Sequence, residues 1–335
     1  MTMNQNVQGN TIKESLNKIY VVGDLVKNGL TLANEGEENE CVRGSLILRT
    51  EDKSEIEINY FANKYKKKDG NFTNETNSQF DTLVNVMESY VDMSNASEGE
   101  EVTTVKIGAG SIRANDYINK DGILVSGNRY NASFANKLDT KDLELNPKNA
   151  KFEVSGVIEN IEQELKNGNL TGNNIISLNI IGYNGSIIPV KLTIPQDLVQ
   201  PFSSAGFFVG SVGRFNGNIV NATETYMEQQ SFGDPVPRTR TKRMLEIRGG
   251  SPLTLDGLGI TNEQYEMCKN KRQAHLNEIR TKAQGGQQNG STQNAFGQPP
   301  VQNANNPFGQ AQVNTNNPFG GQQNVNNTFG GFVQQ

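Results

Sequence analysis

The sequence NKIYVVGDLV at residues 17–26 sets the fold class of this chain. From Ile19 onward it is rich in β-branched residues, which favour extended backbone, and it stands where a first strand would begin. Apolar and polar residues alternate at 42–50 and again at 55–61, which predicts two further strands with one buried face each. The chain therefore opens as a β protein.

The rest of the first half continues in a recognisable order. Apolar side chains recur at helical spacing over 79–91, and strand patterns return at 102–113 and 123–134 on either side of a hairpin turn at 119–122. Residues 66–77 are predicted to form a polar loop. Three strands, a helix and a two-stranded hairpin are typical of a five-stranded OB barrel.

The second half repeats this pattern about 132 residues later. At that offset Ser45-Leu-Ile-Leu48 meets Ser177-Leu-Asn-Ile180, and Glu57-Ile58 meets Pro189-Val190. We therefore predict a mainly β protein with two tandem OB-type β-barrels, a C-terminal helix and a disordered tail. The predicted segments are a flexible N-terminus (1–14), an OB-fold domain (15–140), a linker (141–150), an OB-like domain (151–230), a basic connector (231–260), an amphipathic helix (261–283) and the tail (284–335).

The tail contains no charged residue and is dominated by Gln, Asn and Gly, so it is too polar to bury a core and is predicted to be disordered. Asn-x-Phe-Gly repeats recur along it every ten to twelve residues. Regularly spaced rings on a polar chain suit weak multivalent contact with partners. The rings are those of Phe296, Phe308, Phe319, Phe329 and, near the end, Phe332.

The first half resembles the bacterial and phage single-stranded DNA-binding protein family. Residues 17–25 are similar to the opening strand of that family, and a second strand ending in Arg49-Thr50, a third ending in Phe61, a helix and a Gly-containing strand follow in the family's order. Over residues 15–134 the resemblance implies an OB fold that binds single-stranded DNA. As a whole the chain also resembles larger phage replication proteins with duplicated OB domains. The chain departs from the family at its end, which lacks the acidic tip that recruits replication enzymes.

Composition narrows the function further. The net charge is −5, so a polyanion would have to be bound by cations gathered locally. Cys41 and Cys268 form no paired motif, and neither an export signal nor a long apolar run is present, which favours the cytoplasm (the host cytoplasm if viral) and no membrane. His275 is the only histidine, and no phosphate-binding loop or nucleophile motif occurs. We expect no enzyme, no cofactor and no metal, although a carboxylate-based nuclease is left open.

Single strands are bound by a cationic groove whose aromatic rings stack on bases. The candidates in the first barrel occupy outward strand positions, the loop after the third strand and the last strand: Arg43, Arg49, Phe61, Lys64, Tyr65, Lys66, Lys67, Lys68, Lys106, Arg113, Arg129 and Tyr130. A second basic cluster lies in the connector: Arg238, Arg240, Lys242 and Arg243. The ordinary alternative is that the lysines lie in a solvated loop and that the rings close the barrel end.

These features predict a sequence-tolerant single-stranded DNA-binding protein of (phage) DNA replication or recombination. It would coat and protect exposed strands and recruit replication or recombination proteins through its tail, and homo-oligomer formation is left open. The alternative is a phage structural or replisome-scaffold protein whose OB domains bind only proteins.

Overall fold

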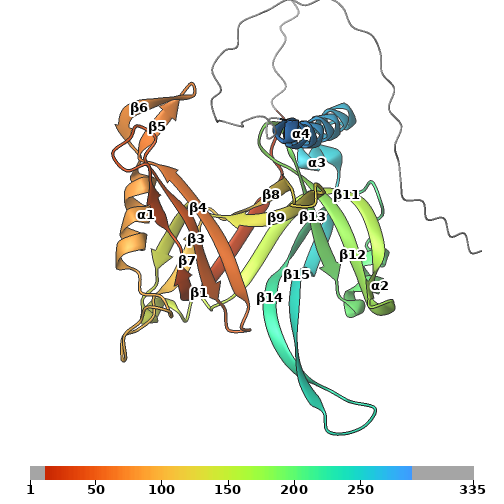
Figure 1. Cartoon of the computed structure of the whole chain (residues 1–335). Helices are drawn as coiled ribbons and strands as arrows, with labels where there is room; N and C mark the ends of the chain where they lie inside the picture. Colours follow the sequence, from red (N-terminus) through yellow and green to blue (C-terminus); the bar gives the residue numbers. More distant parts are fainter. Residues whose placement is uncertain (1–11, 289–335) are drawn as a thin grey trace, which may run out of the picture. The chain divides into compact units, whose positions relative to one another are not determined.

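The structure is a computed structural model that describes residues 12–288 (Figure 1). Strands predominate over helices. The elements in chain order are β1 (Asn17–Asn28), β2 (Thr31–Ala33), β3 (Cys41–Arg49), β4 (Glu55–Asn63), β5 (Tyr65–Lys68), β6 (Asn71–Thr76), α1 (Ser78–Ser89), β7 (Thr104–Gly108), β8 (Ser111–Ile118), β9 (Leu124–Asn131), β10 (Phe134–Lys137), η1 (Thr140–Asp142), β11 (Ala150–Lys166), β12 (Asn169–Ile181), η2 (Tyr183–Gly185), β13 (Ile187–Ile194), α2 (Gln196–Ser204), β14 (Val212–Glu228), β15 (Val236–Leu253), α3 (Leu255–Leu258) and α4 (Asn262–Gln288).

Strands β11 to β15 close into a five-stranded barrel. β11 pairs with both β12 and β14, β12 pairs with β13, and β14 pairs with β15. A parallel contact between β13 and β15 completes the ring. The sequence predicts two tandem barrels, and this one accounts for the second of them.

The N-terminal strands join that barrel along one edge, where Asn17–Val21 of β1 pairs with Ala150–Val154 of β11. From β1 the sheet continues through β3, β4, β9 and β8. Because Ile19 and Phe152 face each other at this junction and both are buried, one apolar core continues from the N-terminal strands into the barrel.

The strands predicted at 19–26, 42–50, 55–61 and 123–134 lie close to β1, β3, β4 and β9, whereas the strand predicted at 102–113 is divided between β7 and β8. The helix predicted at 79–91 is α1, which buries Phe80, Leu83 and Val86 and is capped by the side chain of Asn77. The prediction of a polar loop at 66–77 is wrong, because β5 and β6 form an antiparallel hairpin there. Residues 65–76 alternate in exposure too weakly to be recognised as strands from apolar periodicity.

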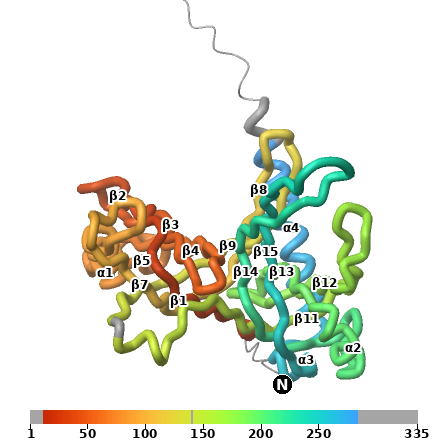
Figure 2. Tube along the Cα trace, turned by 90° about the horizontal axis from the view of Figure 1, so that it is seen from below, coloured from red at the N-terminus to blue at the C-terminus, as the bar shows by residue number. Residues whose placement is uncertain are grey.

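The prediction of a basic connector at 231–260 is also wrong. Residues 236–253 form β15, the last strand of the barrel, and Leu245 and Ile247 are buried in the core. Residues 238–243 are polar on both faces of the strand, because a two-stranded ribbon exposes both faces to solvent. The sequence there has no apolar periodicity from which a strand could be predicted. β14 and β15 run together beyond the barrel as this ribbon (Figures 1 and 2).

The predicted C-terminal helix is α4. It begins with a capping box, since the backbone N–H of Gln264 donates to the Thr261 hydroxyl and the side chain of Gln264 accepts from the N–H of Thr261. Tyr265 and Cys268 pack against the barrel from this helix. Within residues 12–288, no helix has the length and apolar character needed to cross a membrane.

Candidate nucleic-acid interface

The outer face of β3 and β4 carries three of the predicted residues on one side. Side chains alternate along each strand, so Leu46 of β3 and Ile58 of β4 point into the core. The residues next to the buried ones on each strand point outward. Arg43 lies directly opposite Phe61, and Arg49 lies opposite Glu55. Phe61 is 55% exposed, which is high for a large aromatic side chain. Arg43, Arg49 and Phe61 therefore share one surface.

Two further predicted arginines face each other on the neighbouring strands. Arg113 of β8 pairs in register with Arg129 of β9, and both side chains are exposed. Like charges directly opposite each other destabilise a sheet. β9 lies beside β4, where Asn59 is in register with Asn131. This contact brings Arg129 onto the same outer surface as Phe61.

Three adjoining hollows follow this surface, and we call them together the basic groove. The first, about 450 Å³, contains Arg43, Phe61 and Arg129 in its wall. The second, about 540 Å³, shares Asn59 and Arg129 with the first. The third, about 480 Å³, lies between the β3–β4 turn and the ribbon of β14 and β15, and it shares Asn221 and Arg243 with the second. The basic side chains of the groove are Arg43, Arg49, Lys53, Arg129, Lys191 and Arg243, against the carboxylates of Glu55 and Glu57.

Several of these cations lack an acidic partner. Arg49 is paired with Glu55 at 2.6 Å, and Lys191 lies 3.6 Å from Glu162. Within residues 12–288, no ion pair engages Arg43, Lys53 or Arg129. The groove is thus locally basic on a chain whose net charge is −5.

Asn221 holds the two walls of the third hollow together. Its backbone N–H donates to the Ser54 hydroxyl at 3.1 Å, and its side-chain amide donates to the carbonyl of Glu55 at 2.5 Å. Its side-chain oxygen accepts from Nε of Arg243 at 2.9 Å. The β3–β4 turn is therefore fixed against β14, and the position of the Arg243 guanidinium is set in advance of any ligand.

The lysines of the β5–β6 hairpin form a separate group. Lys64 is paired with Glu40 at 2.8 Å, and this hydrogen bond raises the pKa of Lys64 and lowers the pKa of Glu40. Lys66 is paired with Glu75 at 3.1 Å, and the ammonium of Lys67 lies 4.2 Å from the centre of the Phe72 ring. Neither the predicted ring of Tyr65 nor Lys68 lines the basic groove. The hairpin follows directly after the end of β4.

The remaining predicted residues are Lys106, Tyr130 and the phenylalanines of the tail. Lys106 is on β7, opposite Val22 and Asn136, and donates to Asn146 at 2.7 Å. Tyr130 lies in the wall of the second hollow and also packs against the core, and burial raises its pKa to about 12. The tail residues Phe296, Phe308, Phe319, Phe329 and Phe332 lie outside the described residues.

The predicted basic cluster on β15 is divided by strand alternation. Arg238, Arg240 and Lys242 share one face and are paired with Glu228, Glu224 and Glu246. Arg243 is on the opposite face and lines the basic groove. Strand formation is the physical reason that four neighbouring cations do not act as one patch.

Sequence reasoning missed Lys53 and Lys191. Lys53 lies in a turn with no marked pattern. Lys191, however, stands 132 residues after Asn59, which lines the same hollow, so the internal repeat could have drawn attention to it. Among residues 12–288, no cluster of three or more His, Cys, Asp or Glu side chains is arranged to bind a metal ion.

Comparisons with known proteins give one family and loose likenesses to solved structures. The model of the family described as YorF matches residues 15–282. A deletion variant of the single-stranded DNA-binding protein from Thermus aquaticus superposes with 11% identity and a TM-score of 0.41, over 72% of this chain and 95% of that one. A replication protein A heterotrimer bound to single-stranded DNA superposes with 11% identity and a TM-score of 0.17, over 72% of this chain and 51% of that one. No curated protein matches the sequence. Superpositions this loose carry no conclusion about the present chain.

Proposed function

The chain belongs to the YorF family, and from the chemistry of its basic groove we propose that it binds single-stranded DNA with little regard to sequence. The proposal depends on one observation: Arg43, Arg129 and the exposed ring of Phe61 meet in one hollow, and neither arginine is paired with a carboxylate of the described chain. Unpaired guanidinium groups suit phosphates. A ring beside them offers a surface for an unstacked base.

A single strand fits this combination better than a duplex. Stacking on Phe61 needs a base whose face is open, and bases in a duplex already stack on their neighbours. Every base has such a face, so the contact would tolerate any sequence. The opposed pair of Arg113 and Arg129 supports the same view, because a phosphate between two like charges would remove their repulsion.

We also propose that the N-terminal strands form a second OB-type barrel, related to β11–β15 by duplication. β3 pairs with β4 so that Leu46 faces Ile58, and β12 pairs with β13 so that Leu178 faces Val190, which is the same register 132 residues later. Each set also contains one parallel contact between strands distant in the chain, β4 with β9 and β13 with β15. Shared register at a constant offset is what duplication of one barrel would leave.

In the cell, the proposed role is to coat strands exposed during (phage) DNA replication or recombination. Coating would protect them and prevent reannealing. The tail, with its Asn-x-Phe-Gly repeats, would recruit replication or recombination proteins by weak multivalent contact. The rival is a phage structural or scaffold protein whose barrels bind only proteins.

Fluorescence anisotropy with a labelled oligothymidylate and a labelled duplex, at about 50 and 200 mM salt, tests the proposal. We expect tighter binding of the single strand and a fall in affinity with salt. Arg129→Ala should weaken binding about tenfold and reduce the salt slope by about 0.7, the value for one lost phosphate contact on a single strand. Arg280→Ala, an exposed arginine on α4, is the control of equal charge.

Two results would reject DNA binding through this groove. Equal or absent binding of both nucleic acids would favour the scaffold protein. Equal effects of Arg129→Ala and Arg280→Ala would show that net charge, and not the basic groove, governs the interaction.

A further inference from the structure

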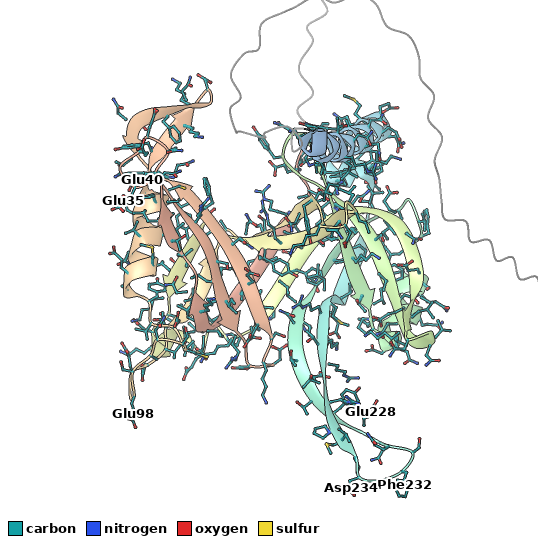
Figure 3. All side chains as sticks on the ribbon, in the orientation of Figure 1. Glu35, Glu40, Glu98, Glu228, Phe232 and Asp234 are labelled. Atoms are coloured by element: carbon teal, nitrogen blue, oxygen red, sulfur yellow. The ribbon has the colours of Figure 1, made fainter. Side chains whose placement is uncertain are left out.

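The ribbon formed by β14 and β15 has two free edges of different character. β11 leaves β14 after Asn218, and from Asn221 to Glu228 the only strand paired with β14 in the described chain is β15. Figure 3 shows Glu228, Phe232 and Asp234 at the far end of this ribbon. A two-stranded ribbon is marginally stable alone, and its free edges can each accept another strand.

The direction of the backbone groups along β14 can be read from Asn221. Its N–H bonds to Ser54 and so points away from β15. Because alternate residues of a strand direct their N–H and C=O to the same side, those of Thr223, Thr225 and Met227 also point outward from the ribbon. These three residues offer unpaired donors and acceptors along the free edge of β14.

The edge of β15 is protected against pairing. Pro237 lies opposite Met227, at an outward position, and has no N–H to donate. The strand also carries long charged side chains over residues 238–243, and charged side chains on an edge strand disfavour pairing with another chain. The edge of β14 has no proline and no cation between 221 and 228, and it contains threonines and Tyr226, which favour strands. One edge is thus closed to pairing and the other is open.

We propose that the free edge of β14 pairs with the same edge of a second copy of this chain, antiparallel about a two-fold axis at Thr225. The two ribbons would then form one four-stranded sheet with β14 of each copy at its centre. This inference goes beyond the proposed DNA binding, and the two surfaces meet at Thr223, which also lines the third hollow. An isologous contact of this kind closes on itself and does not continue into fibres.

Charge and the length of the free edge together select the register. With the axis at Thr225, Glu224 faces Tyr226 of the second copy, and Glu228 faces Ala222 of the second copy. An axis at residue 224 would place Glu224 opposite itself, and an axis at 226 would place Glu224 opposite Glu228. Within each copy, Arg240 and Arg238 already neutralise these two carboxylates on the other side of β14. An axis at 223 would need the N–H of Asn221, which already bonds to Ser54, and an axis at 227 would extend past the end of β14 at Glu228. The axis at 225 therefore pairs the free edge with no like charges opposed.

The first test is the mass of the full chain by sedimentation equilibrium over a wide concentration range. We expect a dimer of the 36.8 kDa chain. Thr225→Pro removes an N–H that β15 does not use, so the variant should fold and its dimer should weaken at least tenfold. Thr239→Pro is the matched control, because Thr239 faces Thr225 across the ribbon but lies on the β15 edge. If Thr225→Pro fails to fold, Thr225→Lys replaces it. This variant should also weaken the dimer, because the two introduced lysines would lie opposite each other at the axis.

Cross-linking tests the register. Hydrogen-bonded antiparallel partners have Cα atoms about 5.5 Å apart, within reach of a disulfide. Mild oxidation of Thr225→Cys should give a covalent dimer, while Thr223→Cys, which would face Met227 of the second copy, should not. Cys41 and Cys268 are buried and leave the background low. A monomeric wild type, equal effects of the two proline variants, or equal cross-linking of the two cysteine variants would overturn the proposal.

Discussion

The guanidinium of Arg272 on α4 donates to the carboxylate of Asp116 on β8, with 2.6 Å between Nη2 and Oδ1. The side chains are only 13% and 3% exposed. The same guanidinium donates to the Ser126 hydroxyl of β9. Since Tyr265 of the same helix packs against the β11–β15 barrel, α4 ties the β8–β9 hairpin to that barrel. The two sets of strands that line the basic groove are thus joined at a third place, besides the β1–β11 pairing and Asn221.

Arg272→Met should destabilise the fold by about 3 kcal/mol, because removing one member of a buried pair leaves the other charge uncompensated. Urea unfolding followed by circular dichroism measures the loss. Lys282→Met removes a cation from an exposed ion pair on the same helix and should leave the midpoint unchanged. A loss of equal size in both variants would mean that helix charge, and not the buried pair, is responsible.

The same pair predicts a pH dependence. Burial alone would raise the pKa of Asp116, but the hydrogen bonds from Arg272 and Ser126 and the charge of Arg272 outweigh burial and hold that pKa below its ordinary value. Its folded pKa is therefore below its unfolded value of about 3.9, so its contribution is complete above that pH and disappears as the pH falls through the folded pKa. The difference in unfolding free energy between wild type and Asp116→Asn should be constant at neutral pH and decrease below about pH 4. A difference that grows on acidification would contradict this assignment.

Gly156 in β11 marks a close approach of two strands in the barrel. A Cβ atom there would lie 2.2 Å from the carbonyl oxygen of Asn179, which no backbone of this geometry can accommodate. We expect Gly156→Ala to destabilise the chain by about 1–3 kcal/mol in urea unfolding. Gly127→Ala in β9 is the control, since its nearest neighbour would be 3.9 Å away. A tolerated Gly156→Ala would argue against the observed β11–β12 register.

The strands that could be predicted from sequence are those with one buried face. β3 and β4 alternate between apolar and polar residues, and their predicted bounds of 42–50 and 55–61 differ from the observed ones by at most two residues. The part of β15 that extends beyond the barrel could not be predicted, because both faces of the ribbon are exposed and its residues show no apolar alternation. The sequence from Arg238 to Arg243 therefore suggests a basic connector instead of a strand.

The basic groove could be predicted only in part, because it depends on contacts between distant segments. Alternation along β3 and β4 places Arg43 and Phe61 outside, and both were predicted on the binding surface. Nothing local indicates that Asn221 bonds to Ser54 and Glu55, although this contact creates the third hollow and brings Arg243 beside Arg49. Pairing with acids, as for Lys64 and Arg240, is equally invisible in one sequence.

Phe61 gives the sharpest prediction about DNA binding. Its ring is 55% exposed and contributes little to the core, so Phe61→Ala should leave the unfolding midpoint close to that of wild type. Loss of one stacked base costs about 1–3 kcal/mol, which corresponds to a five- to 150-fold weaker affinity for oligothymidylate. Because a ring carries no charge, the salt slope should stay unchanged, in contrast to Arg129→Ala. Phe208→Ala is the control, since Phe208 is 64% exposed and lines none of the three hollows. If both phenylalanine variants bind as tightly as wild type, stacking on Phe61 is wrong, and cations alone would have to hold the strand.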